Sequence, residues 1–159
     1  MKKPWKIIKT FKFTNIKKDG LKILNKKNFR TSPWIDDIII SNCFKLDNKK
    51  LPIKLFKVKI KELGFKKPTY LKNIYKKAKK KGLDLVEPEI AIYTRLLYKN
   101  QKVGEWLRFA TPFNSMVDSD GVPHLPKLGK ALKTFFLETY WSYPKAIFHP
   151  NNDFIFQKK

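Results

Sequence analysis

The chain has 159 residues, of which 42% are hydrophobic and 31% are charged, and its formal net charge at pH 7 is +23. This length is sufficient for one domain with its own hydrophobic core, and the apolar content excludes a chain that is disordered throughout. The single cysteine, Cys43, excludes an internal disulfide framework and a cysteine-rich zinc site.

Cys43 follows an apolar run and is predicted to be a buried small hydrophobic residue. No stretch reaches the roughly 20 apolar residues that a membrane-spanning helix needs. Lysines interrupt the apolar residues near the N-terminus before the core of a signal peptide develops. A protein of this kind, with one thiol and no membrane span, is expected in the cytoplasm.

The positive charge is concentrated in residues 1–81, which hold 26 lysines and arginines against 5 acidic residues, whereas residues 82–159 hold 10 against 8. Such an excess attracts polyanions such as RNA and DNA. Only Arg30, Arg95 and Arg108 are arginines, and lysine is poorly suited to reading base edges, so sequence-specific recognition is disfavoured. Compositional drift from AT-rich coding explains the same excess without a ligand, and both interpretations stay open.

In chain order, residues 5–13 predict a short strand and residues 19–40 predict one or two short helices. The second helix is expected to begin at Ser32 and Pro33, because serine caps a helix N-terminus and proline fits its first turn. In residues 53–63, apolar residues alternate with lysines, which is typical of a strand with one buried face. Lysines on an exposed edge strand would also prevent unwanted pairing.

Residues 69–81 predict the clearest helix, with Thr69 as N-cap and Gly82 as the C-terminal stop. One side carries a hydrophobic stripe of Leu71, Ile74, Tyr75 and Ala78. The opposite side carries the predicted nucleic-acid-binding residues Lys72, Lys76, Lys79 and Lys80. A lysine-rich helix face that is merely solvated is the alternative.

The second half is predicted to be rich in strands. Residues 90–98 and 105–113 predict a hairpin joined by a turn at 99–104, residues 118–121 predict a tight turn, and residues 135–141 and 154–156 predict later strands. We therefore expect one α+β domain over residues 1–159, with an antiparallel sheet packed by the 69–81 helix and one or two short N-terminal helices.

A polar or stacking surface is predicted around Trp106, Arg108 and Arg95, because an indole ring and guanidinium groups suit bases and phosphates. Strand alternation places Trp106 and Arg108 on one side and Glu105 on the other. Two alternatives stay open: Trp106 is a core residue, or Arg95, Arg108 and Glu105 form a polar cluster on one sheet surface.

Asp118, Asp120 and His124 lie in one loop and are candidates for acid–base catalysis or metal binding. The loop is not an EF-hand, since its twelfth position, with Asp118 counted as the first, is Gly129 rather than glutamate. The glycines have no phosphate-binding spacing. No cofactor and no metal is predicted.

Motifs along nearly the whole chain carry a resemblance, among them Glu62-Leu63-Gly64-Phe65, Thr69-Tyr70, Gly82-Leu83-Asp84-Leu85, Gly104-Glu105-Trp106-Leu107 and Ser119-Asp120-Gly121. The chain resembles a family of small uncharacterised bacterial proteins of the kind seen in candidate-phylum genomes. The resemblance implies a bacterial origin and no particular activity, and the lysine excess departs from the family pattern.

Three hypotheses follow for function. The leading one is a non-catalytic module that binds RNA or DNA without sequence preference. The second is a protein-interaction or regulatory module whose lysines only keep it soluble. The third is a small hydrolase or nuclease that uses Asp118, Asp120 and His124.

Overall fold

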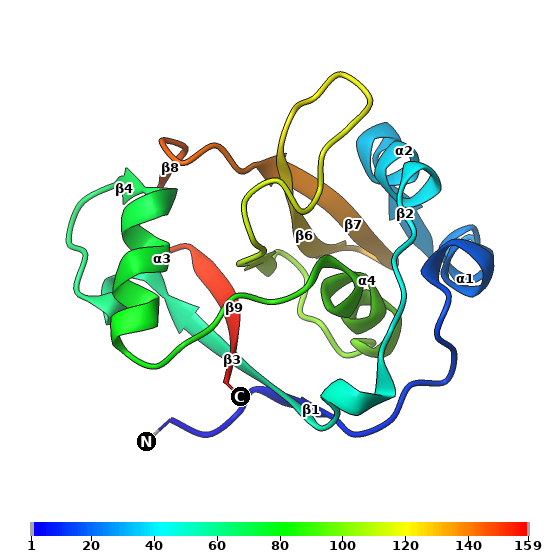
Figure 1. Ribbon diagram of the computed structural model, residues 1–159, viewed down its shortest axis with the longest axis horizontal. Coiled ribbons are helices and arrows are strands. Elements are labelled where there is room, and N and C mark those ends of the chain that lie inside the picture. The colour runs from blue at the N-terminus through cyan, green and yellow to red at the C-terminus, as the bar shows by residue number, and fades with distance from the viewer. Residues whose placement is uncertain (1, 159) are drawn as a thin grey trace.

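The structure is a computed structural model that describes residues 2–158, and its centre is a seven-stranded sheet (Figure 1). In spatial order the strands are β1 (Lys6–Ile8), β3 (Ile53–Lys59), β9 (Asp153–Lys158), β5 (Trp106–Phe109), β6 (His124–Ala131), β7 (Thr134–Trp141) and β2 (Phe29–Thr31). A second sheet pairs β4 (Thr69–Tyr70) with β8 (Ile147–Phe148). The helices are α1 (Leu21–Leu24), α2 (Pro33–Ser41), α3 (Leu71–Lys80) and α4 (Pro88–Leu97). The α+β class is confirmed, although β2–β7 and β5–β9 pair in parallel, which makes the large sheet mixed.

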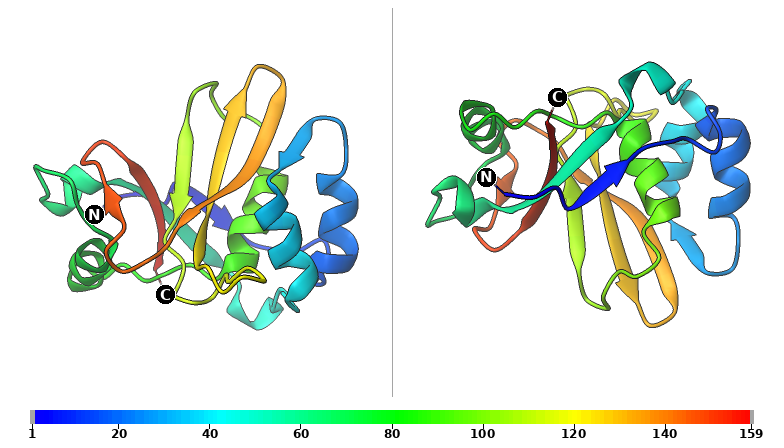
Figure 2. Two further views of the ribbon diagram at one scale, coloured as in Figure 1. Left: turned by 90° about the horizontal axis from the view of Figure 1, so that it is seen from above. Right: turned by 90° about the horizontal axis from the view of Figure 1, so that it is seen from below.

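Helices cover the large sheet from both sides, with α1, α2 and α4 on one side and α3 on the other (Figure 2). Strand β3 shows the division, since Leu55 belongs to the hydrophobic core on the α4 side and Phe56 to the core on the α3 side. Helices α3 and α4 have ten residues each. Within residues 2–158, no helix combines the length and the apolar character that crossing a membrane requires.

The prediction of a strand over residues 90–98 is wrong, because these residues belong to α4. Pro88 begins the helix, which suits a proline at the first turn. Every residue from Ile90 to Leu96 is buried, so the helix has no polar face and no 3.6-residue pattern. The predicted hairpin is therefore also wrong, and the 99–104 turn connects α4 to β5, which pairs with β6 and β9.

The two predicted N-terminal helices are present as α1 and α2. The Ser32 hydroxyl accepts a hydrogen bond from the Ile35 amide at 3.3 Å, and Pro33 is the first helical residue, as expected. Strand β1 is shorter than predicted. Cys43 lies beyond the end of α2 and is exposed, so its predicted burial is wrong.

Strand β3 ends at Lys59, and a 3₁₀ turn (Ile60–Leu63) follows it. Gly64 ends that turn with φ of 103°, a left-handed conformation that glycine adopts readily. Because β3 lies between β1 and β9, it is not an edge strand, and the expected edge protection by its lysines is wrong.

The predicted 69–81 helix is present as α3, but it begins at Leu71 rather than after a Thr69 cap. Thr69 and Tyr70 instead pair with β8. The first amides of α3 donate to backbone carbonyls of the segment beside β8, from Leu71 to Ala146 at 2.8 Å and from Lys72 to Pro144 at 3.0 Å. Gly82 follows the helix with φ of 74°, which confirms it as the stop.

Candidate nucleic-acid interface

Helix α3 separates apolar from basic residues as its sequence predicts. The stripe of Leu71, Ile74, Tyr75 and Ala78 is buried. The Tyr75 hydroxyl donates to the Thr111 carbonyl at 2.8 Å, and burial raises the pKa of Tyr75. The opposite side, called here the α3 lysine face, is exposed and consists of Lys72, Lys76, Lys79 and Lys80.

The lysines of the α3 lysine face form no ion pairs within residues 2–158. Helix α3 contains no aspartate or glutamate. Among residues 2–158, the lysines in ion pairs are those at positions 2, 50, 57 and 59, and none of them belongs to α3. The four lysines are therefore free of ion pairs within residues 2–158 and available to an external partner, although Asp84 and Glu87 line the same hollow as Lys76 and Lys79.

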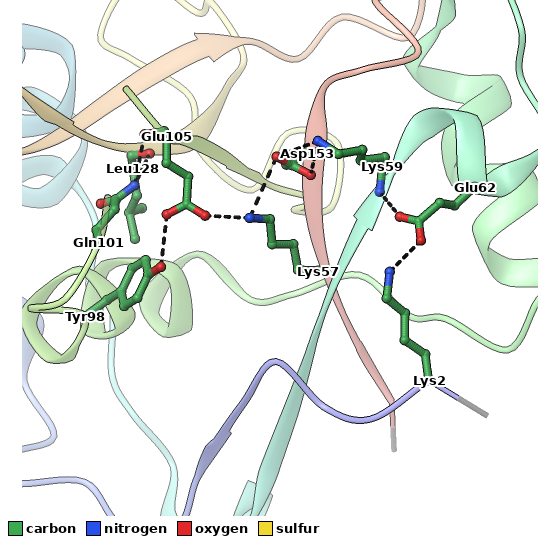
Figure 3. A network of polar contacts seen from close by, with 9 residues as sticks. All are labelled: Lys2, Lys57, Lys59, Glu62, Tyr98, Gln101, Glu105, Leu128 and Asp153. Atoms are coloured by element: carbon green, nitrogen blue, oxygen red, sulfur yellow. Dashed lines mark hydrogen bonds and ion pairs between the residues drawn. The ribbon is translucent and has the colours of Figure 1, made fainter. Parts of the chain in front are cut away.

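Lys57 and Lys59 of β3 are in a different situation, because they form an internal network (Figure 3). Lys57 Nζ lies 2.5 Å from Glu105 Oε1 and 3.8 Å from Asp153 Oδ2, and Lys59 Nζ lies 3.2 Å from the Asp153 carboxylate. The Tyr98 hydroxyl donates to Glu105 Oε2 at 2.9 Å. Burial, with the neighbouring Glu105, raises the pKa of Tyr98 to about 12. The network links β3, β9 and the end of α4.

Beside this network is an open cavity of about 530 Å³. Its lining is mainly basic and consists of Lys2, Lys3, Trp5, Lys57, Lys59, Lys61, Glu62 and Asp153. Three of these lysines are held by carboxylates, since Lys2 Nζ also lies 2.6 Å from Glu62 Oε1 (Figure 3). The charge of the cavity is thus partly compensated, which makes it a weaker anion site than the α3 lysine face.

The Glu105 network yields a stability prediction. Glu105→Gln is expected to lower the free energy of unfolding by about 1 to 2 kcal/mol, because it leaves the partly buried Lys57 with one carboxylate partner. Glu62→Gln is the matched control: its pair with Lys2 is exposed, and its loss should cost less than about 1 kcal/mol. Urea unfolding measures both, and equal losses would contradict a structural role for the network.

Arg95 does not lie on a surface, so its predicted place in a stacking site is wrong. The residue is on α4 with 0% of its surface exposed. Its guanidinium donates to the Gln101 side-chain oxygen at 2.6 Å and to the backbone carbonyls of Tyr98, Gly129 and Phe136 at 2.6, 3.1 and 3.3 Å. Burial lowers the pKa of Arg95 to about 10, so it remains charged at neutral pH.

Trp106 and Arg108 lie on the same side of β5, as alternation predicts, and both are partly exposed. Glu105 lies on the other side in the network with Lys57, so the expected cluster of Arg95, Arg108 and Glu105 does not form. Trp106 packs over Gly129 of β6, where any larger residue would collide with the indole ring. This side of the sheet also carries Lys127, Phe136 and Tyr140, which sequence reasoning missed.

Asp118 and His124 are brought together, whereas Asp120 is exposed and apart from the histidine ring. His124 Nε2 lies 2.8 Å from Asp118 Oδ2, and Nδ1 lies 3.0 Å from Thr139 Oγ1. His124 is only 2% exposed, and both ring nitrogens have partners. The pair therefore fastens the 118–121 turn to the sheet and leaves no free nitrogen for a substrate. Across residues 2–158, no three potential metal ligands cluster.

The hydrogen bond from His124, with those from the Val122 and Asp120 amides, lowers the pKa of Asp118 below its ordinary value. A carboxyl with a lowered pKa in the folded protein stabilises it above the unfolded pKa, near 3.9, and this contribution is lost as pH falls through the lower, folded pKa. We expect wild type to be more stable than Asp118→Asn at neutral pH and the difference to shrink below about pH 4. Unfolding at several pH values tests this, and a constant difference would contradict it.

Comparison with protein-family models, with curated proteins and with solved structures finds no match to this chain. Any functional proposal therefore rests on the geometry of its own residues.

Proposed function

We propose that this protein binds RNA or DNA through the phosphate backbone, without catalysis and without reading base sequence. The proposal is carried by one observation: the α3 lysine face is exposed, lies on a helix without acidic residues, and forms no ion pair in the part of the chain that the structure describes. Lysine contacts phosphate as a mobile point charge rather than as a fixed fork, which gives affinity with little specificity.

The lysines are arranged so that they can contact successive phosphates of one nucleic-acid strand. Lys72, Lys76 and Lys80 follow one another at intervals of four residues, so they lie along one side of α3. Each lysine that neutralises a phosphate releases condensed counterions, and this release drives association. The compensated lysines of the Glu105 network add less, because their carboxylate partners repel phosphate.

The test is the salt dependence of binding by nuclease-treated protein to labelled single- and double-stranded RNA and DNA of random sequence. Four phosphate contacts on duplex DNA predict that affinity falls about 100-fold between about 50 and 200 mM salt, with little difference between sequences. Affinity that is insensitive to salt, or no binding to any of the four nucleic acids, would contradict the proposal.

A second candidate, a protein-interaction module, is favoured by exposed aromatic residues around His124. Trp34 of α2 packs its ring beside His124 and is 55% exposed, and Trp141, opposite His124 in β7, is 62% exposed. Exposed apolar clusters mark protein interfaces. This candidate predicts that a partner protein co-purifies with wild type and with a variant whose α3 lysines are replaced by glutamate, but not with Trp34→Ser/Trp141→Ser. The opposite pattern would contradict it.

A further inference from the structure

One half of the large sheet has an open side next to α3. Strand alternation directs Leu107, Leu128 and Leu137 into the core beneath α4. On the opposite side, α3 covers β3 and β9, and Phe56 and Phe156 of these strands lie in the hydrophobic core beneath it. The β6–β7 hairpin extends away from α3 (Figure 2). Its open side, with that of β5, is called here the sheet platform and consists of Trp106, Arg108, Lys127, Phe136 and Tyr140.

The platform presents aromatic rings in fixed positions. The indole of Trp106 rests on Gly129 and lies 6.1 Å from the ring of Phe136. Tyr140 is 37% exposed, and the centroid of its ring lies 4.9 Å from that of Phe148. Rings supported from below by backbone and by other rings lose little freedom when a flat ligand stacks on them.

The platform also carries two positive charges that lie close together. Arg108 and Lys127 face each other directly across β5 and β6, an arrangement of like charges that destabilises a sheet. Arg108 Nε is buried without a hydrogen-bond partner among residues 2–158, and Lys127 Nζ lies 4.6 Å from the Trp106 ring and 5.9 Å from the Tyr140 ring. Acidic residues lie near both cations, since Glu138 is opposite Lys127 on the same side of the sheet and Asp153 interacts with Arg108. An anion placed between Arg108 and Lys127 would relieve their repulsion.

We propose that the sheet platform binds single-stranded nucleic acid, with bases stacked on Trp106 and Tyr140 and phosphates beside Arg108 and Lys127. Proteins bind single-stranded nucleic acid through aromatic side chains interspersed with cationic ones, because unpaired bases can unstack from one another and stack on protein rings. A duplex keeps its bases stacked internally and cannot offer them to a flat sheet. The flexible Lys127 covers the indole in the free protein and moves to phosphate when a base takes its place.

Strands β8 and β4 connect the platform to the start of α3. The ring of Tyr140 contacts Phe148 of β8, and β8 pairs with β4, whose Tyr70 precedes α3. Lys72 Nζ lies 5.7 Å from the Tyr70 ring. This inference therefore rests on the proposed function and specifies it: α3 supplies charge for any nucleic acid, and the platform adds preference for single strands.

The experiment measures affinity for an oligouridine or oligothymidine of about 12 nucleotides, within the range that one stacking domain covers, and for a duplex of equal length. Trp106→Leu and Tyr140→Leu should each weaken single-strand binding by about 5- to 100-fold and leave duplex binding unchanged. Trp106→Phe and Tyr140→Phe keep a ring and should keep most of the affinity. Wild type should also show tryptophan quenching by the single strand that Trp106→Phe lacks.

A second variant avoids reliance on the rings. Arg108→Met/Lys127→Met preserves the sheet. It should reduce the slope of log affinity against log salt concentration for single-strand binding by the equivalent of about two phosphate contacts. Unchanged single-strand affinity in the ring and charge variants would overturn the platform while leaving the α3 lysine face in place. Equal loss of single-strand and duplex binding would also overturn it, and a wild type that binds neither would remove the proposed function itself.

Discussion

Replacing Arg95 by leucine is expected to lower the free energy of unfolding by about 3 to 5 kcal/mol, the largest effect on stability of any substitution considered. Four oxygen atoms, two from the 98–101 segment and one each from β6 and β7, accept hydrogen bonds from this one guanidinium on α4. Leucine fills part of the volume but leaves those buried acceptors without a donor, and each such loss costs about 1 to 3 kcal/mol before the structure relaxes.

Arg108→Met is the matched control, because Arg108 lies on the open side of the sheet and its Nε has no partner to lose among residues 2–158. Its loss should change stability by less than about 1 kcal/mol. Urea unfolding at pH 7 measures both variants. A loss for Arg95→Leu no larger than that for Arg108→Met would show that the buried arginine does not hold α4 to the hairpin.

Reversing Lys72, Lys76 and Lys80 to glutamate is expected to weaken nucleic-acid binding at least about 100-fold near physiological salt, since three phosphate contacts become repulsive. The slope of log affinity against log salt concentration should fall by the equivalent of about three phosphate contacts. These side chains are exposed and unpaired, so the thermal stability of the variant should change little.

Reversing Lys22, Lys26 and Lys27 provides the control with an identical change in net charge. These lysines are exposed around α1, on the opposite side of the sheet from α3. If affinity depends on the α3 lysine face, this second variant should bind within a few-fold of wild type. Equal losses in the two variants would instead assign binding to overall charge, with no particular surface responsible.

The sequence predicts elements well wherever one face is polar. Helix α3 and strand β7 have one buried side each, so their periodicity matches the structure. Helix α4 is buried all round and rich in isoleucine and aromatic residues, so local pattern could not distinguish it from a strand. The start of α3 was misplaced because carbonyls of residues 144 and 146, distant in sequence, replace the Thr69 cap.

Strand β6 and the sheet platform depend on long-range pairing that no local pattern reveals. Pro126 and Gly129 are unfavourable inside a strand, yet the pairing of β5 with β6 stops at Lys127, just before the proline, and Gly129 makes room for Trp106. The neighbours of Trp106 on β7 follow from that register. The burial of Arg95 follows from α4 being a helix rather than a strand, and only the fold supplies the carbonyls that accept its hydrogen bonds.

The α3 lysine face can be tested as the contact surface by lysine acetylation with and without nucleic acid, measured residue by residue by mass spectrometry. We expect Lys72, Lys76, Lys79 and Lys80 to be protected when RNA or DNA is bound and Lys22, Lys26 and Lys27 to react at unchanged rates. Uniform protection of all exposed lysines, or protection at α1 and not at α3, would contradict the claim that this helix is the nucleic-acid interface.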